Sequence, residues 1–262
     1  MISVQNVSKS YESRRGVIPA LERVTFAVAA SEFVCLVGPS GCGKSTLLKL
    51  ILGIMKPTSG DVFVHGTRVT APRADCSMMF QSPLLLPWRT VRKNVLFPIE
   101  ILGRDPLDYK ERATALLEMV GVEGFADHYP RELSGGMQQR VAICRALIHE
   151  PDVLLLDEPF AALDSITREQ LNDDLLRIWA ETGCTIVLVT HNVDEAVYLA
   201  NRVLVFSDRP GRIIDELAID LPEPRTDEVR QSGAFYLATQ EIRRLLGLAK
   251  APRPGARPRS RR

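Results

Sequence analysis

The feature that most constrains the fold of this sequence is a glycine-rich loop, Gly38-Pro-Ser-Gly-Cys-Gly-Lys-Ser-Thr46, between an apolar run and a helical pattern. The apolar run Phe33–Val37 contains the β-branched residues typical of a buried strand, and Leu47–Leu52 indicates a helix that begins at the loop. Glycines in such a loop let backbone N–H groups surround phosphate oxygens, and the helix N-terminus adds a positive dipole end. This order therefore predicts a phosphate-binding loop, called the phosphate loop below, in an α/β fold.

The phosphate loop supplies the contacts that a nucleoside triphosphate needs. The ammonium of Lys44 is placed to reach the β- and γ-phosphates, which also makes it a candidate catalytic group, and the Ser45 hydroxyl is placed to bind Mg²⁺. ATP and Mg²⁺ are therefore the expected ligands. The candidate nucleotide contacts are Gly38, Pro39, Ser40, Gly41, Cys42, Gly43, Lys44, Ser45 and Thr46.

A second motif places two adjacent carboxylates after another apolar run, Val153–Leu156. An acid at the end of a strand beside a phosphate loop binds Mg²⁺ directly or through water, which is the role predicted for Asp157. Glu158 follows it and suits the orientation or deprotonation of an attacking water molecule. The pair predicts hydrolysis of the bound nucleotide.

A third motif, Leu133–Arg140, begins a helix with a serine and two glycines. Ser134 is the predicted N-cap, and Gly135 and Gly136 leave the N–H groups of the first turn uncovered. Such a helix end can bind an anion, and the alternative is an ordinary capped helix with a flexible first turn. Because the phosphate loop already provides one anion site, a second anion site in the same chain requires an explanation.

The remaining pattern predicts a phosphate-loop NTPase core with a mostly parallel sheet, an antiparallel β subdomain and an inserted helical subdomain over residues 83–150. Continuous apolar runs alternate with helical segments in the core, whereas the N-terminal runs alternate apolar and polar residues. The expected strands are 2–7, 21–29, 33–37, 76–80, 153–156, 185–189 and 203–206, with a further hairpin at 61–69 that turns at Gly66. A charged loop is expected at 12–15. The expected helices are 90–101, 108–120, 134–149, 167–180 and 193–200.

Charge is uneven along the chain, although the net charge is only +1. Residues 249–262 carry +6, which leaves −5 for the rest, so no nucleic-acid partner is expected. The tail is rich in Pro and Arg, which predicts disorder after a nucleotide-binding domain of residues 1–248. Contact of this tail with anionic lipid is the alternative to a solvated tail.

Location follows from what the sequence lacks. The five cysteines show no C-x-x-C spacing, which favours a reducing compartment. The first residues lack a basic segment followed by an apolar run, and no apolar stretch approaches 18 residues. We expect a cytosolic chain that reaches a membrane only through another subunit.

Taken in order, these motifs make residues 1 to about 248 resemble the ATP-binding subunits of ABC transporters. Leu133–Arg140 is similar to the signature motif of that family and is the most specific match. The resemblance implies a head-to-tail dimer that holds each ATP between the phosphate loop of one subunit and the signature helix of the other. Ser134, Gly135 and Gly136 would then contact the γ-phosphate across the interface.

Four further residues match family positions. By resemblance, Tyr11 stacks on adenine, and Gln81 senses Mg²⁺ and the attacking water. Asp164 lies in a loop that crosses the dimer interface, and His191 contacts the γ-phosphate. The alternatives are a half-buried strand aromatic, a surface amide and a structural histidine. The expected Mg²⁺ ligands are therefore Ser45, Gln81 and Asp157, and the expected catalytic residues are Lys44, Gln81, Glu158 and His191.

Two function classes remain for such an ATPase: a transporter motor, or a soluble ABC ATPase of DNA repair or translation. The second class usually has tandem cassettes, long coiled-coil insertions or zinc-binding cysteine pairs, which this sequence lacks. We therefore expect a transport motor. An exporter is the alternative within that class.

Three segments, Leu85–Thr90, Asp157–Asp164 and Ser207–Arg212, resemble the nitrate/sulfonate/taurine importer group. This resemblance implies a small anion as cargo, a homodimer, two transmembrane permease subunits, an external solute-binding protein and a place at the cytoplasmic face of the cell membrane. Importers of pyrimidine precursors are the alternative. Trp88 is either a core residue or a docking contact for the permease.

Overall fold

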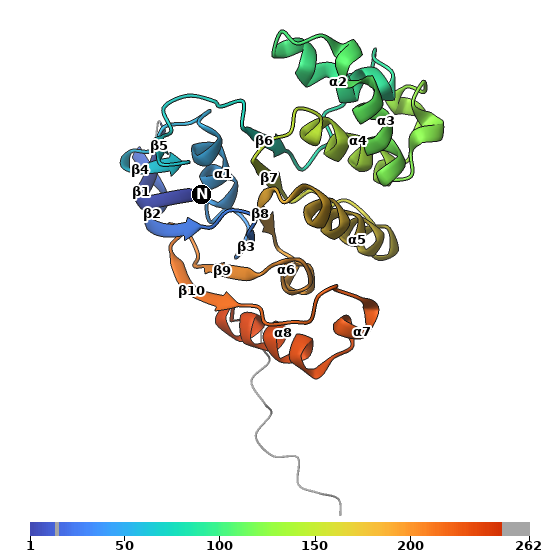
Figure 1. Ribbon diagram of the computed structural model, residues 1–262. Coiled ribbons are helices and arrows are strands. Elements are labelled where there is room, and N and C mark those ends of the chain that lie inside the picture. Colours follow the sequence, from blue (N-terminus) through green and yellow to red (C-terminus); the bar gives the residue numbers. More distant parts are fainter. Residues whose placement is uncertain (14–15, 248–262) are drawn as a thin grey trace, which may run out of the picture.

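The computed structural model describes residues 1–13 and 16–247, and the predicted tail lies outside this part of the chain. Its frame is a six-stranded sheet in the order β10-β9-β3-β8-β7-β6 (Figure 1). The strands pair in parallel, except that β10 runs antiparallel to β9. Their bounds are β3 Phe33–Val37, β6 Cys76–Met79, β7 Val153–Asp157, β8 Thr185–Thr190, β9 Arg202–Phe206 and β10 Ile213–Ala218.

A second, antiparallel sheet has the order β2-β1-β4-β5. Its strands are β1 Ile2–Ser13, β2 Gly16–Val28, β4 Ser59–Val64 and β5 Thr67–Arg68. The expected hairpin at 61–69 is therefore confirmed. The charged loop expected at 12–15 is wrong at its start, because β1 continues through Ser13 and Glu12 pairs with Val17 across the ladder.

Strand β3 contributes to both hydrophobic cores of the molecule. Phe33, Cys35 and Val37 pack in the core that also contains the helical segments, whereas Val34 and Leu36 pack between the two sheets. Side chains alternate along a strand, so a fully apolar run is required when both faces are covered. Helix α1 (Lys44–Leu52) lies in the core between the two sheets, with Leu47 fully buried.

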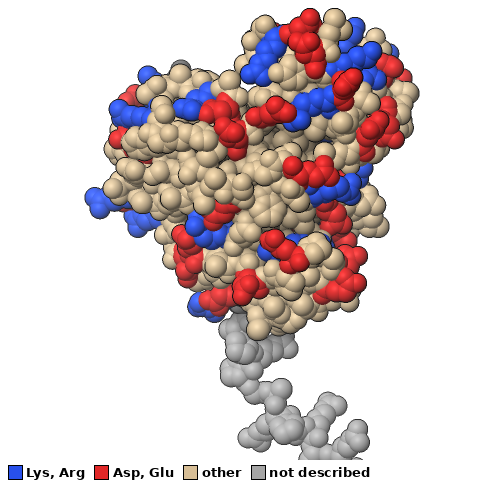
Figure 2. Space-filling model, in the orientation of Figure 1, with Lys and Arg blue, Asp and Glu red and all other residues tan. Residues whose placement is uncertain are grey.

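Only helical elements lie between β6 and β7, and they form a separate lobe (Figure 1). They are α2 Val91–Ile101, η1 Pro106–Tyr109, α3 Lys110–Met119, η2 Glu123–Phe125, η3 Pro130–Glu132 and α4 Gly135–Leu147. On the face seen in Figure 2 the surface is hollowed between this lobe and the antiparallel sheet, and acidic and basic side chains are interspersed. The expected fold class is confirmed.

The remaining helices are α5 Ser165–Thr182, α6 Val193–Leu199, α7 Asp227–Arg230 and α8 Gly233–Leu245. The sequence reading did not predict β10, α7 or α8. Helix α8 packs on α6 with Phe235, Thr239 and Ile242, which recur on one face. No helix among the described residues is both long enough and apolar enough to cross a membrane.

All five cysteines are free and buried. Burial raises the pKa of the Cys76 thiol to about 12 and that of the Cys184 thiol to about 12. Burial also raises the pKa of Cys35 and of Cys144. These thiols pack as small apolar side chains in the core.

Candidate nucleotide-binding and catalytic site

The phosphate loop connects β3 to α1 and is shaped by glycines that cannot be replaced without strain. Gly43 has φ +111°, and a Cβ added there would lie 2.7 Å from the carbonyl oxygen of Ala20. A residue with a side chain would be strained by both its backbone conformation and this contact. The loop therefore lies tightly against β2.

Lys44, the first residue of α1, is 4% exposed. Its ammonium donates hydrogen bonds to the carbonyl oxygens of Gly38, at 2.7 Å, and Pro39, at 2.9 Å. No carboxylate pairs with it in the described chain. Its third contact is a weak one of 3.6 Å to Sγ of Cys42. A buried ammonium at a helix N-terminus that has no anionic partner suits an anionic phosphate.

A cavity of about 250 Å³ lies beside the phosphate loop. Its walls are formed by Tyr11, Ala20, Ser40, Gly41, residues 43–46, Glu158 and Arg209. The Tyr11 hydroxyl lies 3.0 Å from Oγ1 of Thr46, so the aromatic ring borders the loop. The structure thus places Tyr11 in the cavity wall, and adenine stacking stays a prediction.

Ser45 and Asp157 meet at the ends of α1 and β7. The Ser45 hydroxyl donates a hydrogen bond of 2.7 Å to Oδ1 of Asp157. Burial raises the pKa of Asp157, and the neighbouring Glu158 raises it further, while the bond from Ser45 acts in the opposite direction. Two adjacent hard oxygen donors beside a phosphate loop fit Mg²⁺.

Gln81 is not joined to this oxygen pair. Its side chain is exposed, and its carbonyl oxygen accepts a 3.2 Å hydrogen bond from Nε2 of Gln139 on helix α4. The segment after β6 is thereby tied to the helix of the signature motif. A role for Gln81 as a ligand of Mg²⁺ stays a prediction.

Glu158 and His191 form a hydrogen-bonded pair, with Oε2 of Glu158 3.0 Å from Nδ1 of His191. Strand pairing brings them together, since Asp157 is opposite Val189 and the Glu158 N–H donates to the Val189 carbonyl at 2.9 Å. Glu158 has φ +47°, a left-handed conformation that is uncommon outside glycine. This conformation turns Glu158 away from the course of β7, so that the two adjacent acids face different partners.

Glu195 lies behind this pair and was missed by the sequence reading. It is 4% exposed near the start of α6, where the Asn192 side chain caps the helix and accepts hydrogen bonds from the N–H groups of Asp194 and Glu195. Burial raises the pKa of Glu195, while a hydrogen bond with the Thr190 side chain lowers it. The feature of the sequence that could have indicated Glu195 is its position four residues after His191.

The signature motif begins α4 as predicted, with Ser134 as N-cap accepting a 3.3 Å hydrogen bond from the Met137 N–H. Ser134 and Gly135 are exposed, and neither lines the 250 Å³ cavity among the described residues. Gly136 is buried, and a Cβ there would lie 2.6 Å from Cγ2 of Thr167 on α5. The second glycine therefore also has a packing role.

Asp164 is the N-cap of α5. Its carboxylate accepts a 3.0 Å bond from the Thr167 N–H and a 2.7 Å bond from the Thr167 hydroxyl, which hold the pKa of Asp164 below its usual range. This explains the acid at that position within one chain. Contact with a second subunit stays a prediction.

Trp88 is 72% exposed, so the alternative of a core residue is wrong. It lies with Arg89, Leu96 and Leu107 at a hollow of about 600 Å³ on α2 and η1. Leu107 is 76% exposed. The structure thus leaves an exposed apolar patch, called the Trp88 patch below, on the helical lobe.

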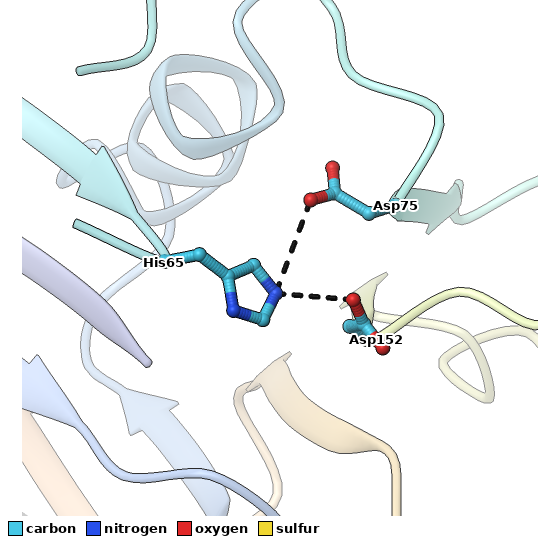
Figure 3. Close-up of side chains that lie close together, drawn as sticks. All are labelled: His65, Asp75 and Asp152. Carbon is cyan, nitrogen blue, oxygen red and sulfur yellow. Dashed lines mark ion pairs between the residues drawn. The ribbon is translucent and has the colours of Figure 1, made fainter. Parts of the chain in front are cut away.

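His65, which the sequence reading left without a role, lies between two carboxylates at the opposite edge of the core sheet (Figure 3). Its Nε2 is 3.1 Å from Oδ2 of Asp152 and 3.9 Å from Oδ2 of Asp75. Arg73 already donates two hydrogen bonds to Asp75, which lower its pKa. With Asp75 already paired with a guanidinium, this group fits a polar contact between the two sheets better than a metal site.

Comparisons with known proteins agree with the geometry of the phosphate loop. A family profile described as ABC transporter matches residues 21–161. The nitrate import ATP-binding protein NrtD of Synechocystis sp. is 45% identical over 251 residues, which cover 94% of this chain and 94% of that protein. The aliphatic sulfonates import ATP-binding protein SsuB of Bacillus cereus is 42% identical over 243 residues, which cover 93% of each.

Solved structures give the same result. The dimeric structure of a bacterial ABC transporter cassette superposes with a TM-score of 0.75 at 35% identity, covering 84% of this chain and 99% of that one. A second dimeric cassette structure, in a post-hydrolysis state bound to ADP and Pi, has a TM-score of 0.74 at 35% identity over the same shares. With its phosphate loop, strand-end carboxylates and signature helix in place, this chain belongs to the ABC transporter family, as an ATP-binding subunit whose ATPase activity is coupled to transport.

Proposed function

We propose that this chain powers the import of a small anion of the nitrate or sulfonate kind. The support for the cargo class is that one relative is named for nitrate import and another for import of aliphatic sulfonates. The subunit works at the cytoplasmic face of the cell membrane, on two transmembrane permease subunits that receive the anion from an external binding protein. Those partners select the cargo, because the nucleotide site does not contact it.

The observation that carries the mechanism is the separation of two anion-binding elements on one chain. The described cavity is lined by the phosphate loop, Tyr11 and Glu158, whereas Ser134 and Gly135 are exposed outside it. A head-to-tail homodimer joins them, with the exposed helix end of each subunit covering the γ-phosphate in the other. Nucleotide binding then holds the dimer together, and hydrolysis releases it.

Hydrolysis in that dimer needs no covalent intermediate. Lys44 and the N–H groups of the signature helix stabilise negative charge on the transferred phosphoryl group. Glu158 orients the attacking water, and His191 contacts the γ-phosphate. Their 3.0 Å contact holds the Glu158 carboxylate in place. Ser45 and Asp157, with Gln81 as a further ligand, would hold Mg²⁺, which would supply additional charge neutralisation. Asp164 would lie at the dimer interface.

The Trp88 patch is the proposed docking site for the permease. Trp88 and Leu107 present large apolar side chains to solvent beside Arg89, which pairs with Glu100 at 2.7 Å. Exposed aromatic anchors with a charged rim are typical of protein interfaces. A short helix of the permease that inserts an apolar side chain at this hollow would pass the closing motion to the membrane.

Complementation between two inactive variants tests the shared site. Lys44→Ala disables the phosphate loop, and Ser134→Arg blocks the signature helix, so each homodimer should lose at least about a hundredfold in ATPase activity. A mixed dimer of the two has one site with both elements intact. Activity should therefore return on mixing, to roughly a quarter of the wild-type rate if subunits exchange freely and sites act independently.

Glu181→Gln, an exposed charge change on α5, is the matched control and should leave activity unchanged. Mixtures that stay inactive, although both chains are folded, would contradict head-to-tail sharing. The cargo class is tested separately by reconstituting the chain in liposomes with the permease and binding protein encoded beside it. ATP-dependent uptake of nitrate or an alkanesulfonate is expected, and uptake of neither ion would exclude the proposed cargo.

A further inference from the structure

The loop Ser207–Arg212, between β9 and β10, marks the importer subgroup in the sequence but has no role in the mechanism above. In the structure it packs against the phosphate loop. The Gly211 N–H donates to the Ala20 carbonyl at 2.9 Å, and the Gly211 carbonyl accepts from the Glu22 N–H at 3.0 Å. A Cβ at Gly211 would overlap the carbonyl oxygen of Cys42 in the phosphate loop. The glycine is therefore required for this close approach.

Internal bonds hold the 207–212 loop in one shape. The Ser207 hydroxyl accepts from the Arg212 N–H at 3.0 Å and donates to the Asp208 carbonyl at 2.8 Å. The Ser207 N–H donates to the Arg212 carbonyl at 2.9 Å. The Arg212 guanidinium then pairs with Glu22 on β2 at 2.6 Å. These bonds hold the loop in a fixed position on β2, the edge strand of the antiparallel sheet.

Arg209 extends from this loop and forms part of the wall of the nucleotide cavity. Its Nε donates a 2.9 Å hydrogen bond to the Pro19 carbonyl. Pro19 pairs with Ser10, next to the pair of Tyr11 with Ile18. Arg209 is thus anchored to β2 one residue from Ile18, the partner of Tyr11, and both Arg209 and Tyr11 line the cavity. Its terminal nitrogens bond to no other described residue, so their donors face the cavity or solvent.

We propose that Arg209, together with Tyr11, binds the adenosine-monophosphate part of ATP and is a nucleotide-binding residue of this subunit. A guanidinium can stack on a base and also donate to a ribose oxygen or the α-phosphate, and its planar fork suits both contacts. The proposal rests on nucleotide binding by the phosphate loop and is independent of the cargo. It assigns a function to the 207–212 loop: it positions Arg209.

Binding of ADP, measured by calorimetry with Mg²⁺, tests the proposal. Arg209→Ala should weaken ADP binding about tenfold, the effect of losing one charge-assisted contact at a partly exposed site. Arg209→Lys should recover part of the loss, because it keeps the charge without the planar fork. Arg244→Ala is the matched control: it removes the same charge at an exposed position of α8 that does not line the cavity, and binding should change less than twofold.

A double-mutant cycle tests the location. If Arg209 and Tyr11 hold the same part of the nucleotide, their effects should overlap. The fold-loss of ADP affinity in the double variant should then be at least about threefold smaller than the product of the two single fold-losses. Losses that multiply fully would place Arg209 elsewhere and overturn the proposal. Wild-type ADP affinity in Arg209→Ala would reduce Arg209 to a structural anchor. A wild-type chain that binds no ADP would instead contradict the proposed ATPase function.

Discussion

At the scale of single residues, the catalytic end of the cavity depends on one backbone conformation. Glu158 has φ +47°, and its N–H is held by the Val189 carbonyl at 2.9 Å. A non-glycine residue in this region carries strain that the surrounding bonds must hold. The result is an acid that faces His191 while its neighbour Asp157 faces Ser45. In the proposed mechanism Asp157 is then available to Mg²⁺ and Glu158 to the attacking water.

Glu195 provides a prediction on pH. Its pKa is raised by burial, so between the unfolded value of 4.5 and the higher folded value the native state binds more protons than the unfolded state. The free energy of unfolding therefore falls as pH rises through that window. Glu195→Gln should raise the free energy of unfolding at pH 7 and flatten its pH dependence above pH 4.5, measured by urea unfolding.

The control for this change is Glu169→Gln, which removes the same charge at an exposed position of α5. It should leave the pH dependence as in the wild type. If Glu195→Gln destabilises the chain at pH 7 while the control does not, Glu195 is ionised and paired in the native state, and the prediction is wrong.

At the scale of elements, the packing of α4 against α5 depends on one glycine, Gly136. The Thr167 methyl group lies 2.6 Å from the position of a Cβ on Gly136, and the Thr167 hydroxyl is bound to Asp164 at 2.7 Å. The threonine side chain therefore cannot rotate away without loss of the bond from its hydroxyl to Asp164. This contact sets how closely the signature helix approaches the core.

Gly136→Ala should consequently lower the free energy of unfolding by about 1–2 kcal/mol, the usual cost of overpacking. Gly135→Ala is the matched control, because its Cβ would meet only Leu163 at 3.7 Å, and it should be neutral or slightly stabilising. Adding Thr167→Ser to Gly136→Ala removes the methyl group but keeps the hydroxyl, and should restore most of the loss. Thermal unfolding of the four chains is the measurement, and equal stability of the two alanine variants would contradict the fit.

Elements with strong local patterns were predictable, and weakly patterned elements were not. Val153–Leu156 is apolar throughout because both of its faces are covered, and this pattern specified a core strand. Strand β10 carries the exposed residues Ile214, Asp215 and Glu216 at the sheet edge, so no alternation marks it. Helix α8 does carry a helical pattern, with Ser232 as N-cap, so its periodicity predicts a helix there.

The candidate site divides in the same way. The phosphate loop was predictable because its chemistry is local: nine consecutive residues carry it. The bond between Glu158 and His191, and the approach of Arg209 to the cavity, depend on strand pairing between distant segments. A single sequence names such residues only through resemblance. It cannot supply their contacts.

At the scale of the whole molecule, one chain presents two surfaces that call for partners: the exposed helix end at Ser134 and the Trp88 patch. Gln139 links them, since it lies on α4 and donates to the Gln81 carbonyl in the segment that leads to Trp88. A displacement of the signature helix would thus be transmitted toward the docking patch. If the permease docks at the Trp88 patch as proposed, this contact is a physical route from nucleotide to permease.

The Trp88 patch gives the prediction at this scale. Trp88→Ala should leave ADP binding unchanged and weaken association with the permease by about thirtyfold, the loss expected for one central aromatic anchor. Tyr236→Ala is the control, since Tyr236 is 62% exposed on α8, away from the patch. Co-purification with the permease and uptake by reconstituted liposomes are the readouts. Normal association of Trp88→Ala would remove the patch from the interface.

The buried cysteines have a practical consequence for watching these motions. Thiol reagents attack the thiolate, and burial both shields the five sulfurs and, for four of them, disfavours that ionised form. The native cysteines should therefore react little with maleimide dyes and thiol-reactive spin labels. A single cysteine introduced on an exposed helix would carry a probe with little competing modification, and the closure of two subunits around ATP could be followed as a change in distance.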